Sequence, residues 1–216
     1  MKLNVNNRTI RLVGIGIGSV LFALILWLLG YDVQRTVAAV PYFLLFLILI
    51  KGPIIRIWPA TLKRFSPGFP VSWRSEFGIW FALWSVAHVL LVWSARDWDV
   101  VGYLTDMSPW AFGALVAVII AIVLAFTSNT KALNFLGGKA WKWHQSHGTY
   151  VIFWLVVVHI YDRAYLRPYE EVGFPSNDPL HWVYILMTLV VVILHVTAFA
   201  KIVAEYRKTG EYPRGL

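Results

Sequence analysis

Cysteine is absent from this 216-residue chain, and charged residues are scarce. The lack of cysteine excludes disulfides, thiolate-ligated haem, covalently attached c-type haem and iron–sulfur clusters. Charged residues make up only 14% of the chain, whereas 59% of the residues are hydrophobic, and the mean hydropathy is +0.65. Such a composition is typical of an integral membrane protein.

Long polar segments are lacking too. The polar connections are far shorter than the ~50 residues that a soluble domain needs, so we expect a single membrane domain over residues 1–216. The apolar runs predict an all-α bundle of six transmembrane helices. The expected spans are about 12–29, 35–50, 75–93, 109–127, 143–161 and 180–204. We expect the second to end at Lys51-Gly52-Pro53, and the first to pack closely through Gly14 and Gly18.

The basic residues are distributed unequally between the two sides of this bundle. Of the 19 Lys and Arg, only Arg35, Arg96, Arg163 and Arg167 fall on the side opposite the chain ends. The positive-inside rule therefore predicts a multi-pass protein of a bacterial or archaeal cytoplasmic (inner) membrane, with both termini in the cytoplasm. The same rule explains the net charge of +8, so the lipid bilayer is an expected partner and nucleic acid is not.

Two histidines lie inside apolar segments, where an imidazole needs a polar partner or a metal. His88 lies in the third expected span and His159 in the fifth, and both spans run outward. At a helical rise of ~1.5 Å per residue, His88 lies ~20 Å and His159 ~24 Å from the inner ends of these spans. Two neutral imidazoles at similar depth on facing helices can coordinate one haem iron axially. We therefore predict a haem b site at His88 and His159.

Three further histidines lie in the inner half of the expected bundle. His144 and His147 begin the fifth span, and His195 lies in the sixth. Around an ideal helix His144 lies ~60° and His147 ~120° from His159. A second, inner haem is one interpretation of this group. The alternative is that His144 and His147 are interfacial residues among the neighbouring tryptophans.

Two stretches of the sequence resemble the ferric-reductase-like transmembrane domain family: FGIWFALWSVAH, and LAFTSNTKALNFLGGKAWKWHQSHGTYVIFWLVVVHIYD. Within that family the chain is most similar to the haem-binding membrane subunits of periplasmic methionine sulfoxide reductase systems. The resemblance implies a six-helix bundle that binds haem b through His88 and His159. The family's fifth helix has a tryptophan, a histidine four residues on, and another histidine thirteen residues later. Here Gln145 lies four residues after Trp141, whereas His147 lies four residues after Trp143. The identity of the inner ligand therefore stays open between His144 and His147, with or without His195.

The resemblance also implies a function. Two histidine ligands leave no open position on the iron, which suits electron transfer by an oxidoreductase subunit that has no catalytic residue of its own. Electrons would come from a cytoplasmic flavin reductase or quinol, with FMN or a quinone as a further candidate cofactor. They would pass to a periplasmic reductase or to ferric iron. The alternative is a non-redox transporter or scaffold whose histidines relay protons or bind a metal ion.

Overall fold

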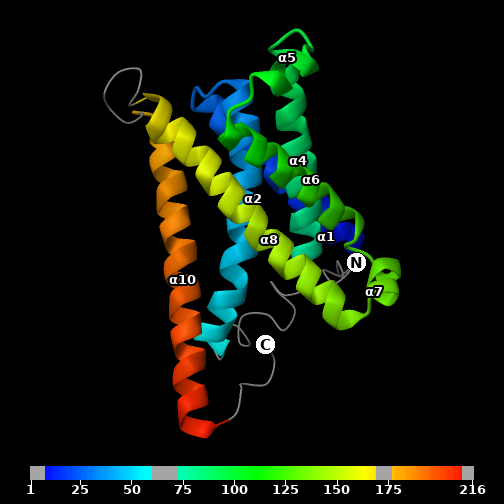
Figure 1. The fold of residues 1–216 in the computed structure, drawn as a ribbon, viewed down its shortest axis with the longest axis vertical. Coiled ribbons are helices and arrows are strands. Elements are labelled where there is room, and N and C mark those ends of the chain that lie inside the picture. Colours follow the sequence, from blue (N-terminus) through cyan, green and yellow to red (C-terminus); the bar gives the residue numbers. More distant parts are fainter. Residues whose placement is uncertain (1–7, 60–72, 169–176, 211–216) are drawn as a thin grey trace, which may run out of the picture.

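A computed structural model describes residues 8–59, 73–168 and 177–210, and in these ranges the chain is helical without any strand (Figure 1). The predicted all-α class is confirmed. The long helices are α1 (Arg8–Leu28), α2 (Val33–Ile57), α4 (Arg74–Ser94), α6 (Pro109–Phe126), α8 (Gly138–Tyr161) and α10 (Pro179–Thr209). Three short elements connect them: α5 (Val100–Thr105), α7 (Thr130–Leu136) and the π-helix η2 (Asp162–Leu166).

Five of the long helices, α1, α2, α4, α6 and α10, are long and apolar enough to cross a membrane. The chain is therefore a multi-pass membrane protein. The fifth predicted span, 143–161, corresponds to α8, which is a continuous 24-residue helix but does not reach the same apolarity. Its first half contains His144, Gln145 and His147, whereas its second half is apolar.

Hydrogen bonds and ion pairs join helices that are distant in the sequence, and they lie at two opposite ends of the bundle, which we name the inner and outer ends after the predicted orientation. At the inner end the side chains of Arg8, Arg74 and Lys201 donate to the carbonyl oxygens of Ser128, Gln145 and Ile57 at 2.8, 3.2 and 3.1 Å. At the outer end Arg35 pairs with Asp178 at 3.3 Å, and Arg167 donates to Ser108 at 3.2 Å. The long helices thus alternate in direction along the chain.

Helix α2 runs further than the sequence predicted. It passes through Pro41 and Pro53 and ends at Ile57, so the predicted end at Lys51-Gly52-Pro53 is wrong. Proline removes one helical hydrogen bond, but membrane helices tolerate that loss where neighbouring groups compensate. Here the Lys201 Nζ donates to the Arg56 and Ile57 carbonyl oxygens at 3.2 and 3.1 Å and so satisfies the end of the extended helix.

The close contact of α1 with α4 is made by Gly16, so the prediction that Gly14 and Gly18 make it is wrong. A Cβ at Gly14 or Gly18 would meet nothing within 4 Å, whereas a Cβ at Gly16 would overlap the indole ring of Trp80. The Trp80 Nε1 donates to the Leu12 carbonyl oxygen at 2.7 Å, which holds the ring across α1. A small residue is therefore required at position 16.

We expect Gly16→Ala to destabilise the bundle, because the added methyl must displace the Trp80 ring. Overpacking of this kind costs about 1–3 kcal/mol. Thermal unfolding in detergent would measure the change. Gly14→Ala is the matched control on the same helix, and we expect it to be neutral or slightly stabilising, since alanine is the better helix former. Equal unfolding temperatures for the two variants would contradict the assigned contact.

Helix α2 supplies much of the buried core, with Val40, Leu44 and Leu45 almost fully covered. It packs against α1, α4 and α10, while α8 packs mainly on α6. At the α6–α8 contact a Cβ on Gly148 would come within 3.0 Å of the Leu124 side chain. Large exposed apolar side chains on α1 and α10 form surfaces suited to lipid.

Candidate functional site

His88 and His159 lie on two helices that do not pack closely against each other. Helix α4, which carries His88, packs on α1, α2 and α6, whereas α8 packs mainly on α6 and ends just beyond His159. The two imidazoles nevertheless share one region, because His159 interacts electrostatically with His88. A planar cofactor held between two side chains requires this combination of nearby ligands and separated helices.

Neither imidazole makes a hydrogen bond with any residue that the structure describes. The Nδ1 atoms of both His88 and His159 are buried and without a partner. A buried polar atom without a hydrogen bond costs free energy, and the cost is greatest in the hydrocarbon core. Two neutral nitrogen donors left without protein partners form a donor set that fits the two axial positions of a haem iron.

A cluster of charged residues lies next to the histidines at the outer end, on and around η2. Arg163 interacts electrostatically with both His88 and His159. Its own pKa is lowered, first by burial and then by Arg167, while Asp162 opposes the shift. Asp162 accepts a hydrogen bond from Arg167 at 3.0 Å, whereas Arg163 makes no hydrogen bond with the described residues. The Arg163 charge therefore acts on both histidines as well as on its charged neighbours.

The inner histidines are dispersed among different surroundings. His147 is exposed, stacks on Trp143 with ring centroids 4.5 Å apart, and contacts the Trp143 carbonyl oxygen through Nδ1 at 2.9 Å. His195 is hydrogen-bonded at both nitrogens, to the Tyr150 hydroxyl at 3.0 Å and to the Val191 carbonyl oxygen at 2.9 Å. His144 is half-buried with an unpartnered Nε2. No hydrogen bond or ring contact in the described chain joins these three histidines.

Gln145, rather than a histidine, lies on the His159 face of α8 at its inner end. Fourteen helical residues separate the two, which leaves them about 40° apart around the axis. Gln145 donates from Nε2 to the Leu124 carbonyl oxygen at 3.1 Å and to Thr127 Oγ1 at 3.0 Å. Trp141 donates to the Thr127 carbonyl oxygen at 2.8 Å. Trp141 and Gln145 thus face α6, while Trp143 and His147 face outward.

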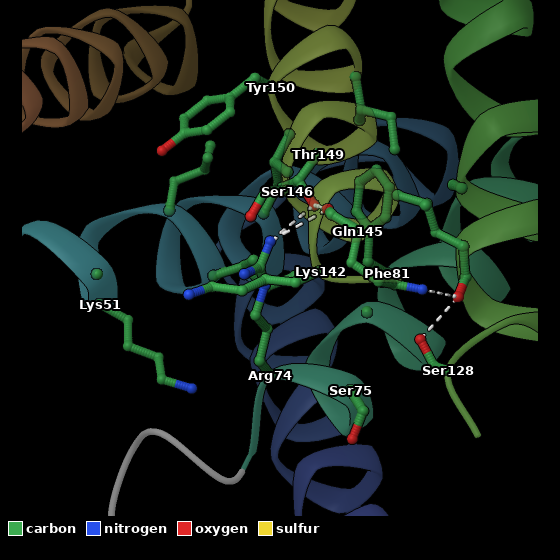
Figure 2. Close-up of a pocket in the computed structure, with 18 of the residues that line it drawn as sticks. Lys51, Arg74, Ser75, Phe81, Ser128, Lys142, Gln145, Ser146, Thr149 and Tyr150 are labelled. Carbon is green, nitrogen blue, oxygen red and sulfur yellow. Dashed lines mark hydrogen bonds between the residues drawn. The ribbon is translucent and has the colours of Figure 1, made fainter. Parts of the chain in front are cut away.

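A cavity of about 500 Å³ lies at the inner end between α2, α4, α6 and α8 (Figure 2). Four basic side chains line it: Lys51, Arg56, Arg74 and Lys142. We predicted that the second span ends at Lys51, but the extension of α2 buries this side chain, with 9% of its surface exposed. Lys63 and Arg64, which follow in the sequence, lie outside the described residues. Basic residues directly following an apolar run were the only sequence signal for this cavity.

The chain is similar over 91 residues to the magnetosome protein MamZ of Paramagnetospirillum magneticum (strain ATCC 700264 / AMB-1), at 36% identity. This match covers 40% of the present chain and 14% of that protein, so the chain spans only a small part of the relative's length. No family model and no solved structure matches.

Proposed function

We propose that this protein carries electrons across a membrane through one haem b bound by His88 and His159. The observation that carries the proposal is the pair of half-buried imidazoles on α4 and α8, which lie within electrostatic range of each other and whose buried Nδ1 atoms have no hydrogen-bond partner among the described residues. His88 and His159 would hold the haem, and two histidine ligands would favour electron transfer over the binding of oxygen or substrate. The proposed arrangement is a six-helix bundle in which α8 crosses the membrane with the five more apolar helices.

The haem, when bound, supplies one-electron chemistry. The protein's own residues have simpler roles. His88 and His159 would hold and orient the group, and Arg163 adds a positive charge beside the site. A nearby positive charge favours the form of the site with one electron more.

The proposed setting is a bacterial inner membrane, with the basic inner end of the bundle in the cytoplasm. The similarity to a magnetosome protein supports a bacterial membrane, and the basic residues at the inner end support the orientation. The proposed donor is a cytoplasmic flavin reductase or quinol. The proposed acceptor is ferric iron or a periplasmic reductase, as in the methionine sulfoxide reductase systems whose membrane subunits the sequence resembles.

The direct test is to produce the full chain in cells supplied with haem precursor, purify it in detergent and record its spectrum. A pyridine haemochrome measurement should give about one haem b per chain, and the reduced protein should show a low-spin spectrum. A colourless protein that is folded by circular dichroism would contradict the proposal. That result would favour the transporter or scaffold alternative.

Replacing Arg163 by glutamine should lower the midpoint potential of the haem, because a cation that stabilises the reduced form is lost. Arg163 is exposed, and a unit charge about 4 Å away in a medium as polar as water contributes about 1 kcal/mol, or roughly 40 mV for one electron. Spectroelectrochemical titration of the purified protein would measure the shift. Arg96→Gln is the control, because Arg96 lies over the Tyr103 ring at 4.9 Å and has no interaction with either histidine. A shift of equal size in both variants would contradict a specific role for Arg163.

The orientation predicts that a reporter fused after Leu216 lies in the cytoplasm. A green fluorescent protein fusion should be fluorescent, and an alkaline phosphatase fusion should be inactive, because the phosphatase is active only in the periplasm. A fusion within the outer connection, at residue 98, should give the opposite pattern. Active phosphatase after Leu216 would invert the orientation and place the His88 and His159 region near the cytoplasm.

A further inference from the structure

The cavity at the inner end gathers positive charge in a way that the proposed haem site does not explain. Lys51 and Arg56 come from α2, Arg74 from the start of α4, and Lys142 from the start of α8. No aspartate or glutamate lines the cavity in the described part of the chain. Arg74 and Lys142 thus bring two positive charges to one cavity. Like charges that lie close together are unfavourable unless an anion joins them.

Only one nitrogen of the Arg74 guanidinium group makes hydrogen bonds with the described residues. Its Nη2 donates to the Gln145 carbonyl oxygen at 3.2 Å and to Thr149 Oγ1 at 3.3 Å. The Nε and Nη1 atoms make no hydrogen bond with the described residues. Figure 2 shows the Arg74 and Lys142 side chains near each other on one side of the cavity, with Lys51 on the neighbouring helix. A guanidinium oriented in this way, beside two ammonium groups, is suited to the oxygens of a phosphate.

The deeper lining of the cavity is apolar. Leu45, Leu49, Phe81, Leu124 and Ile152 contribute to it, and its volume of about 500 Å³ is within the range of cavities that hold small organic ligands. A free inorganic ion would leave this apolar lining uncovered. The lining therefore fits a ligand that joins a phosphate group to an apolar or aromatic body.

We propose that this cavity binds a phosphate-bearing amphiphile, with its phosphate on Lys51, Arg74 and Lys142 and its apolar part against the helices. Two sources carry this chemistry: an anionic phospholipid of the surrounding membrane, and a water-soluble phosphate ester with an aromatic body. The inference does not rest on the haem, because neither His88 nor His159 lines the cavity.

The test uses the purified full chain. Native mass spectrometry of the intact protein should show a bound phosphorus compound. Phosphorus-31 NMR of the organic and aqueous extracts of the denatured protein should then show in which phase this compound lies, which identifies the source. After delipidation, titration with phosphatidylglycerol in mixed micelles or with phenyl phosphate should change the tryptophan fluorescence, since Trp141 lines the cavity. Removing one cation that bonds the phosphate should weaken binding by roughly tenfold.

Arg74→Gln and Lys142→Gln are the test variants, and Lys139→Gln is the matched control at the same end of α8 outside the cavity lining. Because Lys142 is exposed, its replacement leaves the fold intact even if Arg74→Gln does not. Weaker binding in Lys142→Gln with unchanged binding in Lys139→Gln supports the site. Absence of bound phosphorus and of any response to both probes would overturn it, as would equal affinities in all three variants. Haem content is a separate readout and should be unchanged in Lys142→Gln.

Discussion

His159→Ala should abolish the low-spin haem spectrum, and His88→Ala should remove the same component. Under the proposed function each histidine supplies one axial bond, so either loss leaves the iron with a single protein ligand. Neither imidazole has a hydrogen-bond partner among the described residues, so the structure gives these side chains no hydrogen-bonding role apart from binding the haem. Visible spectra and haemochrome content of the purified variants would measure the effect, which we expect to be a complete loss of that component.

His181→Ala is the matched control for these two variants. Its Nδ1 is also buried and without a partner, but it lies on α10 beside Tyr184, with ring centroids 6.3 Å apart. We expect its haem content to equal that of the unmodified protein. If His88→Ala and His159→Ala keep full haem content and an unchanged spectrum, the pair does not bind the iron. If His181→Ala loses haem to the same extent, the losses report general damage to the fold.

Arg11→Leu should be among the most destabilising single changes in this chain. The side chain of Glu76 has 0% of its surface exposed, and Arg11 bonds it from Nε at 3.2 Å and from Nη2 at 2.8 Å. Removing one member of a buried ion pair leaves an uncompensated charge, which costs about 3–5 kcal/mol. Chemical or thermal unfolding in detergent would measure the loss.

The double variant Arg11→Leu with Glu76→Gln should recover much of this loss. Glutamine removes the charge and keeps an oxygen that can accept the hydrogen bond which Ser75 now donates to Glu76 at 2.8 Å. Glu205→Gln is the comparison for an exposed pair, since Glu205 lies 4.0 Å from Lys201 near the end of α10. We expect its effect to stay within about 0.5 kcal/mol. A small effect of Arg11→Leu would mean that Glu76 is protonated or otherwise compensated.

The positions of the long helices followed from the apolar runs, because burial in lipid requires long uninterrupted apolar segments. The errors lie where local rules compete with tertiary contacts. Pro53 predicted a helix end, but Lys201, distant in sequence, satisfies the carbonyls beyond it. The short helices α5 and α7 were missed because they are too short for a periodic pattern. Their N-caps, Asp99 and Asn129, were the available signals.

For the candidate site, too, some features could be predicted from the sequence and others could not. The sequence predicts His88 and His159 as site residues, because a histidine inside an apolar run is rare and unfavourable, and their predicted depth stays a prediction. Which residue of α8 faces α6 is not readable, since Gln145 and His147 differ only in their rotation around the helix. The contacts of Gln145 with Leu124 and Thr127 show which of the two faces the bundle. The basic cavity could not be predicted, because it depends on the extension of α2 past Pro53, where local sequence rules predict a helix end.

The low apolarity of α8 has a consequence for how the protein enters the membrane. Helix α6 has the highest hydropathy of the five apolar helices, at 2.5, and can partition into lipid by itself, whereas α8 cannot rely on its own sequence. The polar groups of its first half find partners on α6: Gln145 and Trp141 donate to the carbonyls of Leu124 and Thr127. If α8 crosses the membrane as we propose, its insertion is coupled to α6, as an antiparallel hairpin closed by α7. The region that holds both His88 and His159 then forms only late in assembly, after α4 is already in place.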